Sequence, residues 1–140
     1  MSIQMTPRER MDAFSKGLPI DRVITVPDMG VTMAPYLGIS ARDYYHSAEK
    51  MAELEVALFN VLNHDSVSIS TSLRGVAEAM GAKVAFPEFQ VSYLLSPIIT
   101  KPDDIRLLTP SNPLKDGKLP ILLKALDLTL RALAQKTDVS

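Results

Sequence analysis

Two segments of the chain place apolar residues at the spacing of an amphipathic helix. Between residues 119 and 135 a leucine recurs every three or four positions, which predicts a long helix with one apolar face. A similar pattern runs from residue 48 to about residue 63, and Ser47 precedes it as an N-cap. The predicted apolar faces are Met51, Leu54, Leu58, Val61 and Leu62 in the first helix, and Leu119, Leu122, Leu123, Leu126, Leu130 and Leu133 in the last.

Shorter helices are predicted from their end signals. Residues 6–9 read Thr-Pro-Arg-Glu, a capping box with proline at the first helical position, and Gly17 ends this helix. Ser40 and Thr100 are N-cap residues for two further short helices, the second over residues 101–108.

The strand-like segments are short and lie between these helices. Residues 22–26 (RVITV) predict a first strand that is buried on both faces. Residues 66–70 alternate serines with Val67 and Ile69, which predicts a second strand with one better-buried face. A helix over residues 73–80 and an extended piece over 83–86 follow. This order of helix, strand, helix and strand is typical of the start of a βα array.

The loops that follow the two predicted strands contain the candidate substrate-binding residues. In α/β proteins, ligands bind at loops beyond the carboxyl ends of the strands. Each residue type has two alternative roles. The hydroxyl groups either orient a polar substrate or cap the next helix. The carboxylate either contacts substrate or stabilises a turn, and the methionine either lines a pocket or packs. The residues are Ser70, Thr71 and Ser72 after the second strand, and Asp28 and Met29 after the first.

Composition narrows the function classes. The 140 residues are enough for one domain, residues 1–140, and no second domain is predicted. The 15 basic and 16 acidic residues form no block of one sign, which argues against nucleic-acid or membrane-surface binding. The chain has no cysteine, so it cannot form a disulfide or a thiolate metal site, and it fits a cytoplasmic location. No apolar run reaches the ~18 to 20 residues of a membrane span.

The two histidines are not predicted to be catalytic. His64 precedes the second strand, at the end of a barrel strand opposite to the chemistry, and is interpreted as structural. His46 lies near two tyrosines, and a lone histidine is rarely a metal ligand. No metal site is therefore expected within the chain.

Five segments carry a family resemblance through their order and spacing. They read MTPRERMDAFSKGLPIDRVITVP, AEKMAELEVALFN, GVAEAMGAKVAFPE, SPIITKPDDIRLL and NPLKDGKLPILLKAL. Together they resemble the uroporphyrinogen decarboxylase (URO-D) superfamily, which holds the decarboxylases of haem synthesis and cobalamin-dependent methyltransferases, including those that methylate coenzyme M. The resemblance implies an α/β fold that is the N-terminal part of a (β/α)8 TIM barrel, with about two barrel strands plus flanking helices. A complete barrel needs about 250 residues.

Two departures from the decarboxylase pattern point to the methyltransferase branch. The decarboxylases have an essential aspartate at the position that matches Ser72. They also follow the first strand with Met-Arg-Gln-Ala-Gly-Arg, whose arginines suit a substrate with several carboxylates. Residues 26–33 here read VPDMGVTM, with no arginine and one acid. The resemblance therefore implies a corrinoid-dependent methyltransferase that moves a methyl group between a corrinoid and a thiol or similar acceptor.

Two alternatives remain open: a uroporphyrinogen decarboxylase, and a non-catalytic stand-alone remnant that acts through oligomer or partner contacts. For the parent enzyme the family implies zinc, a corrinoid (methylcobamide) and a small-molecule or corrinoid-protein substrate. The zinc ligands of the family are histidine and cysteines. They are expected in a C-terminal part, so the chain alone is expected to be inactive and no catalytic residue is assigned. Unpaired strand edges make a homo-oligomer possible.

Overall fold

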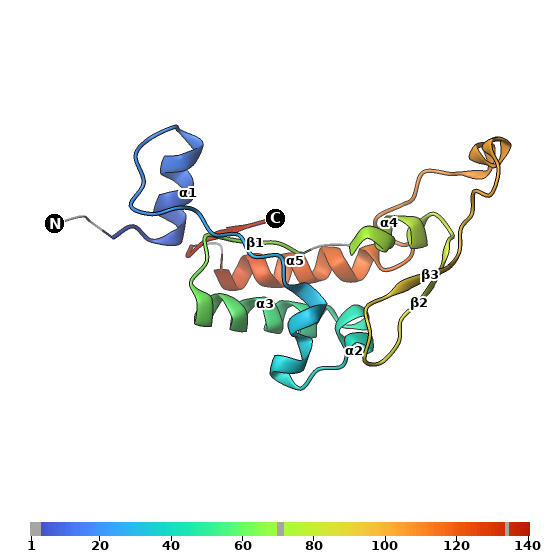
Figure 1. Ribbon diagram of the computed structural model, residues 1–140, viewed down its shortest axis with the longest axis horizontal. Helices are drawn as coiled ribbons and strands as arrows, with labels where there is room; N and C mark the ends of the chain where they lie inside the picture. Colours follow the sequence, from blue (N-terminus) through green and yellow to red (C-terminus); the bar gives the residue numbers. More distant parts are fainter. Residues whose placement is uncertain (1–3, 70–71, 134) are drawn as a thin grey trace.

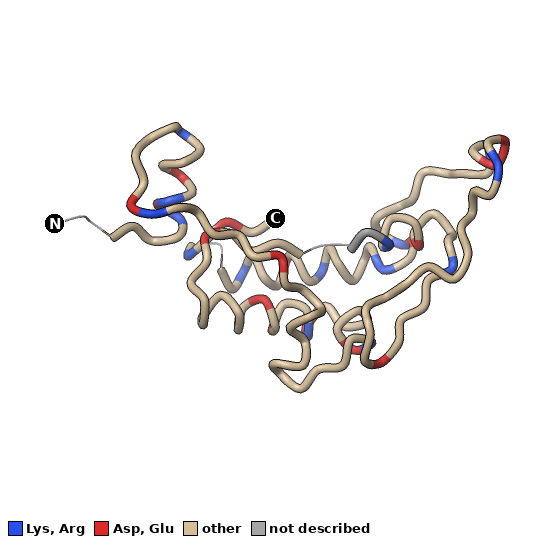
Figure 2. The backbone as a smooth tube through the Cα atoms, viewed as in Figure 1, with Lys and Arg blue, Asp and Glu red and all other residues tan. Residues whose placement is uncertain are grey.

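The computed structural model describes residues 4–69, 72–133 and 135–140 and shows an elongated molecule (Figure 1). Its centre consists of two long helices that pack against each other, α3 (Ala48–Leu62) and α5 (Leu119–Leu133). The N-terminal helix α1 (Pro7–Ser15) lies at one end, and the 3-10 helix η2 (Pro102–Leu107) lies at the tip of the other. Acidic and basic positions are interspersed along the described chain (Figure 2).

The helices begin where the sequence signals predicted. Thr6 and Glu9 form the reciprocal capping box of α1. The Ser47 hydroxyl accepts a hydrogen bond from the Lys50 N–H at 3.2 Å at the start of α3. Asn63 ends α3 in the left-handed conformation, with φ 48°. Because capping needs only residues within one turn of each other, these predictions are confirmed.

One further short helix forms as predicted, and two other segments form 3-10 helices. The Ser40 hydroxyl caps α2 (Ala41–His46), as predicted. The predicted loop after residue 27 contains a 3-10 helix, η1 (Gly30–Leu37), and the predicted helix over 101–108 is the 3-10 helix η2. In η2 the Asp104 carboxylate accepts from Thr100 and from the Lys101 N–H, which holds the first turn.

Two parallel strands form the barrel-like sheet. Strand β1 (Ser66–Val67) pairs in parallel with β4 (Asp138–Val139), with Ser66 opposite Asp138. The pairing extends to Ile69, whose N–H donates to the Ser140 carbonyl at 2.8 Å. The chain between the two strands includes α4 (Ser72–Ala79) and α5, so the crossover is helical. The prediction of a second strand near residue 66 is confirmed, and its partner strand lies at 138–139.

The predicted first strand at residues 22–26 is wrong. This segment is extended but forms no ladder; the Asp65 N–H donates to the Thr25 carbonyl at 2.8 Å, and the Asp65 side chain accepts from the Thr25 N–H. Val23 and Val26 are 81% and 53% exposed, so the segment is not buried on both faces. A parallel strand is buried only when neighbours cover it, and here one backbone hydrogen bond and the side-chain contacts of Arg22 and Thr25 with Asp65 join the segment to the region of β1.

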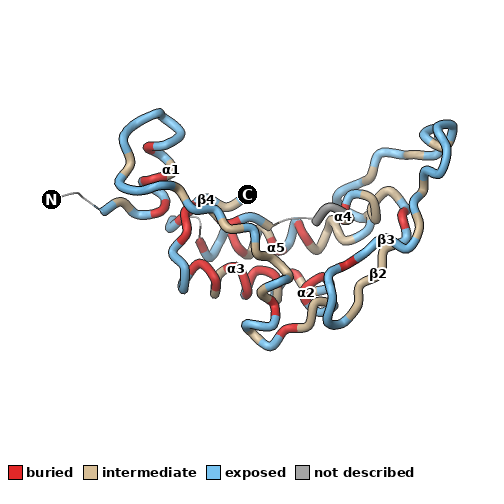
Figure 3. Tube along the Cα trace, in the orientation of Figure 1, coloured by how far each residue is buried: buried red, intermediate tan, exposed pale blue. Residues whose placement is uncertain are grey.

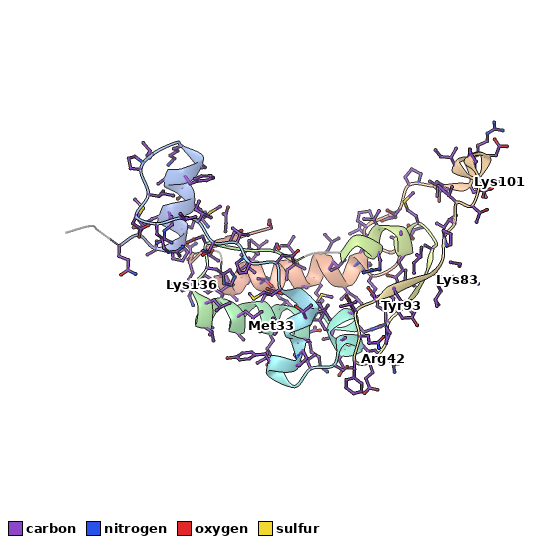
Figure 4. All side chains as sticks on the ribbon, viewed as in Figure 1. Met33, Arg42, Lys83, Tyr93, Lys101 and Lys136 are labelled. Atoms are coloured by element: carbon purple, nitrogen blue, oxygen red, sulfur yellow. The ribbon has the colours of Figure 1, made fainter. Side chains whose placement is uncertain are left out.

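The chain after α4 forms a separate antiparallel pair. Gly81 ends the α4 region with φ 104°, and β2 (Lys83–Ala85) then pairs with β3 (Tyr93–Ser96). The extended piece near residue 83 is thus confirmed, and β3 is its partner strand. Figure 4 shows Lys83 and Tyr93 on this pair and Lys101 at the far tip.

The core lies between α3, α5, α2 and η1, where the buried positions gather (Figure 3). Met51, Leu54 and Leu58 of the predicted α3 face are buried, but Val61 and Leu62 at its end are exposed. The α5 face is shifted as well. Its fully buried members include Ala125 and Thr129, whereas Leu123 and Leu130 are exposed. Small side chains let α5 approach α3 closely, so contact between the helices, not the density of leucines, selects the buried face.

A buried ion cluster holds α1 against the start of β1. The Arg10 guanidinium contacts Asp65 and binds Asp21, with its Nε 2.6 Å from the Asp21 Oδ1. Arg22 binds the same Asp65 carboxylate at 2.7 Å. Burial raises the pKa of Asp65, but the hydrogen bonds from Thr25, Arg10 and Arg22 outweigh it, so the pKa lies below its usual value. The cluster joins residues far apart in the sequence and is structural.

Candidate functional site

The candidate site lies where the first loop meets the end of β1. Met29, from the loop after residue 27, and Ile69, at the end of β1, both pack against the same buried cluster of the core. Because β1 and β4 are parallel, their carboxyl ends face the same way, and this is the side on which α/β barrels bind substrate. We refer to the region formed by residues 28–37 and Ile69 as the substrate end.

The predicted site residues are described to different extents. Asp28 is exposed and Met29 is half-buried against the core. Ser72 is the first residue of α4, and its side chain lies outside the described part of the structure. Ser70 and Thr71 also lie outside the described residues. Substrate binding by these five residues therefore stays a prediction.

Met29 and Met33 do not form an open apolar surface. Both are half-buried and pack against the core cluster. Figure 4 places Met33 near the middle of the molecule. Packing of Met29 against the core is therefore observed, and its role in lining a pocket stays a prediction.

Glu55 is a buried carboxyl group that the sequence analysis did not identify. It lies on α3 four residues after Met51 and three before Leu58, so it is on the buried face, and its residue is only 5% exposed. Its Oε1 has no hydrogen-bond partner among the described residues. The sequence contained one signal for this buried group, because Glu55 occupies a helix position at which the spacing of apolar residues predicts an apolar side chain.

The environment of Glu55 favours its protonated form. Burial raises the pKa of Glu55, Tyr44 acts in the opposite direction, and the Asp28 carboxylate adds a smaller rise, so that the pKa lies at about 7. Tyr44 itself is buried, and burial together with Glu55 raises the pKa of its hydroxyl well above the usual value. Gly30 lies above this hydroxyl, since a Cβ at Gly30 would be 3.6 Å from it.

Neither histidine joins this group. His64 is buried against the Phe59 ring, and burial lowers its pKa, which agrees with the structural interpretation. His46 is exposed; its Nδ1 lies 2.7 Å from the Arg42 carbonyl, and its ring contacts Phe86 edge-on. Within the part of the chain that the structure describes, no three His, Asp or Glu side chains come together as a metal site.

Two hollows border the substrate end, one at Ile69 and the other at Pro35. An apolar hollow of about 160 Å³ follows one side of α5, and a more open one of about 500 Å³ lies between the α2 N-terminus and Phe89. The first has no polar lining residue and the second has no unpartnered buried polar group among its lining residues. The residues of the apolar hollow are Ile69, Pro113, Leu119, Leu122, Leu123 and Leu126.

Comparison with known proteins identifies the class. The family model described as uroporphyrinogen decarboxylase (URO-D) matches residues 6–140, and the chain belongs to this family. Its α/β fold, two parallel strands with flanking helices, is the N-terminal part of the family's TIM barrel.

Among solved structures, a methyltransferase from Methanosarcina mazei is similar to the chain with a TM-score of 0.75 and 21% sequence identity. The match covers 96% of this chain and 41% of the methyltransferase, so the chain spans less than half of that protein. At this identity the likeness concerns the fold. A comparison with curated proteins found no significant match. No helix in the described part of the chain has the length and apolar character that a membrane crossing requires.

Proposed function

We propose that the chain forms the N-terminal part of a methyltransferase of the URO-D family. The full enzyme would move a methyl group between a corrinoid and a thiol or similar acceptor. A small molecule or a corrinoid protein would be its substrate, and it would work in the cytoplasm. Family membership and the fold shared with a methyltransferase support this proposal, and the character of the first loop carries it.

That loop is suited to a substrate other than a polyanion. Residues 26–33 contain Asp28 and no basic residue. Within the described residues, the groups that act on the Glu55 carboxyl are Tyr44 and Asp28, and neither is a cation. A tetrapyrrole with several carboxylates would meet the exposed Asp28 carboxylate here instead of the forked guanidinium groups that bind carboxylates well. This observation disfavours uroporphyrinogen decarboxylation.

The residues present do not fit the zinc that the family implies. The chain has no cysteine, and the described residues bring no three candidate ligands together. We propose that zinc and corrinoid, where the full enzyme uses them, are bound by sequence that follows Ser140, and we derive no step through either group on this chain.

Two assays on the protein expressed from its own gene test this function. In the first, methylcobalamin and 2-mercaptoethanol are supplied, and methylcobalamin absorbance and the methyl thioether product are followed. In the second, uroporphyrinogen is supplied and coproporphyrinogen is measured. We expect thioether formation that requires both thiol and native protein, and no coproporphyrinogen. Coproporphyrinogen formation would establish the decarboxylase alternative, and inactivity in both assays would favour the non-catalytic remnant.

A further inference from the structure

Strand β3 has one edge that no other strand of the described residues covers. It pairs with β2 in a sheet of two strands, which lies in the arm that extends from the body of the molecule (Figure 1). Within the described residues, the backbone groups of residues 93–96 make no backbone hydrogen bond outside this sheet. A free edge presents a row of unpaired N–H and C=O groups and is a template for another strand. The neighbour that β3 lacks is therefore a further extended chain.

The side chains of β3 leave apolar surface in solvent on both faces of the sheet. Tyr93, Leu94 and Leu95 are 47%, 43% and 62% exposed. Because successive side chains of a strand point to opposite faces, neither face is fully covered. Val91 and Ile99, which flank the strand, are 48% and 40% exposed. A hairpin of two strands is only marginally stable in water, so further strands would stabilise this sheet.

The sequence of this edge does not repel a second copy of itself. Residues 89–100 contain no charged residue, whereas exposed edge strands are commonly protected by lysines or other charges that prevent pairing. The charges of the hairpin lie at its two ends instead. Lys83, at the start of β2, is the ladder partner of Ser96, and Glu88 lies in the loop between the two strands. Both charged residues are exposed, so they can act on a partner that pairs with β3.

Antiparallel pairing of two copies brings opposite charges to each end of the combined sheet. A twofold axis through the middle of β3 reverses one hairpin relative to the other. The Lys83 end of one copy and the Glu88 end of the second copy then lie at the same end of the sheet. Parallel pairing would place like charges together at both ends. In the antiparallel arrangement Leu94 and Leu95 meet leucines of the second copy, and such cross-strand apolar pairs stabilise a sheet.

We propose that β3 is an interface between two copies of this chain, which pair antiparallel along this strand and form one four-stranded sheet. Main-chain hydrogen bonds hold the two strands together, as in other complexes formed by adding a strand to a sheet edge. Both copies use the same surface, so the assembly closes as a dimer. Phe89, in the hairpin loop, lines the hollow that borders the substrate end at Pro35, so the interface lies beside that end. The inference is independent of the proposed methyl transfer.

Cross-linking of single cysteines in the intact chain tests the pairing and its direction. The chain has no cysteine, so Leu95→Cys and Ile105→Cys each introduce one thiol, at side chains that are 62% and 64% exposed. Antiparallel pairing brings position 95 of the two copies close together and sends position 105, on η2 at the tip of the arm, to opposite ends. Under mild oxidation we expect Leu95→Cys to form disulfide-linked dimers at least ~10-fold faster than Ile105→Cys. Equal rates, or faster linkage at position 105, would overturn the proposal.

Light scattering over a range of protein concentrations measures the strength of the dimer. Every sample carries Leu123→Asp, so that contacts at the apolar hollow of α5 do not contribute to the mass. Leu95→Lys should weaken dimerisation about tenfold or more, because it places a like charge at the centre of the interface on both copies. Ile105→Lys is the matched control and should leave the dissociation constant unchanged.

Both replaced side chains are exposed, so the variants should fold like their parent, which circular dichroism checks. Two variants with equal dissociation constants would overturn the proposal. A parent that stays monomeric at high micromolar concentration would also overturn it, and would point to an extended segment of a different protein as the partner of β3.

Discussion

Individual polar residues in the interior carry most of the pH dependence expected of this protein. Glu55 and Asp65 are both buried acids, yet their surroundings act in opposite directions. Burial and, to a smaller extent, the Asp28 carboxylate raise the pKa of Glu55, whereas hydrogen bonds from Thr25 and two guanidinium groups outweigh the burial of Asp65 and lower its pKa. Partner charge, not burial alone, decides the sign of each shift.

Glu55→Gln should make the protein more stable at neutral and alkaline pH. The folded-state pKa of Glu55, about 7, lies above the ordinary value of 4.5, so the unfolded chain loses this proton first as pH rises. The wild type should therefore lose stability between pH 4.5 and 7, by on the order of 2 to 3 kcal/mol, and the variant should not. Urea denaturation at pH 5 and pH 8 measures this difference. A wild type and variant with parallel stability curves would contradict it.

Asp65→Asn should strongly destabilise the fold. It removes the common anion of Arg10 and Arg22 and leaves the buried Arg10 guanidinium with Asp21 as its remaining acid partner in the cluster. Breaking a buried pair from one side costs about 3–5 kcal/mol. The matched control is Asp43→Asn, which breaks the exposed Lys50–Asp43 pair and should change the melting temperature little. Equal melting temperatures for the two variants would show that the cluster does not stabilise the protein.

At the scale of elements, the junction between α4 and α5 depends on a glycine. Gly117, just before α5, has φ 54°, and a Cβ at this position would be 2.9 Å from the Ala79 Cα in α4. Both the backbone conformation and the close approach therefore require a residue without a side chain. Lys118, the next residue, binds Glu78 of α4 at 3.0 Å and lies over the Phe86 ring, which strengthens the same junction.

Gly117→Ala should cost more stability than the same change at Gly38. Gly38 also has a positive φ, 67°, but a Cβ there would meet nothing within 4 Å. Gly38→Ala should lose about 1 kcal/mol through backbone strain, and Gly117→Ala should lose a further ~1–3 kcal/mol because α4 must move. Chemical denaturation of both variants at one pH gives the comparison. A larger loss at Gly38 would mean that α4 and α5 do not approach as closely as described.

The elongated shape of the whole molecule leaves apolar side chains of α5 in solvent. Leu123 and Leu130 are exposed, and Leu123 also lines the apolar hollow beside Leu126. The parallel pair of β1 and β4 has no third strand among the described residues. Parallel sheets are normally covered on both faces, and uncovered apolar faces favour association.

The 140-residue chain should therefore self-associate through α5. Burying one leucine contributes roughly 1.5–3 kcal/mol, so Leu123→Asp should weaken association about tenfold or more. Light scattering over a range of concentrations measures the mass. Leu107→Asp is the control, because Leu107 is also an exposed leucine but lies on η2, away from α5. A wild-type chain that stays monomeric at high micromolar concentration, with a sharp thermal transition, would show that it is a self-sufficient domain.

The sequence by itself determined the features that depend on neighbouring residues. Thr6 and Ser47 cap their helices as predicted, because a cap is formed within one turn. Asp28 was recognised as a site candidate from its place after an extended segment. The order of elements predicted the start of a βα array, the family resemblance implied a barrel, and the family match agrees with the resemblance.

Tertiary structure alone decided the features that depend on distant residues. Residues 22–26 have strand-like composition, yet a strand needs partners, and only Thr25 pairs with Asp65. The buried face of α5 is set by the fit of Ala125 and Thr129 against α3, which leucine spacing does not encode. The burial that raises the pKa of Glu55 arises only because other elements pack against α3. Hydrogen bonds between neighbouring residues can be predicted from the sequence, whereas packing and electrostatic interactions between distant residues arise only when separate segments come together in the fold.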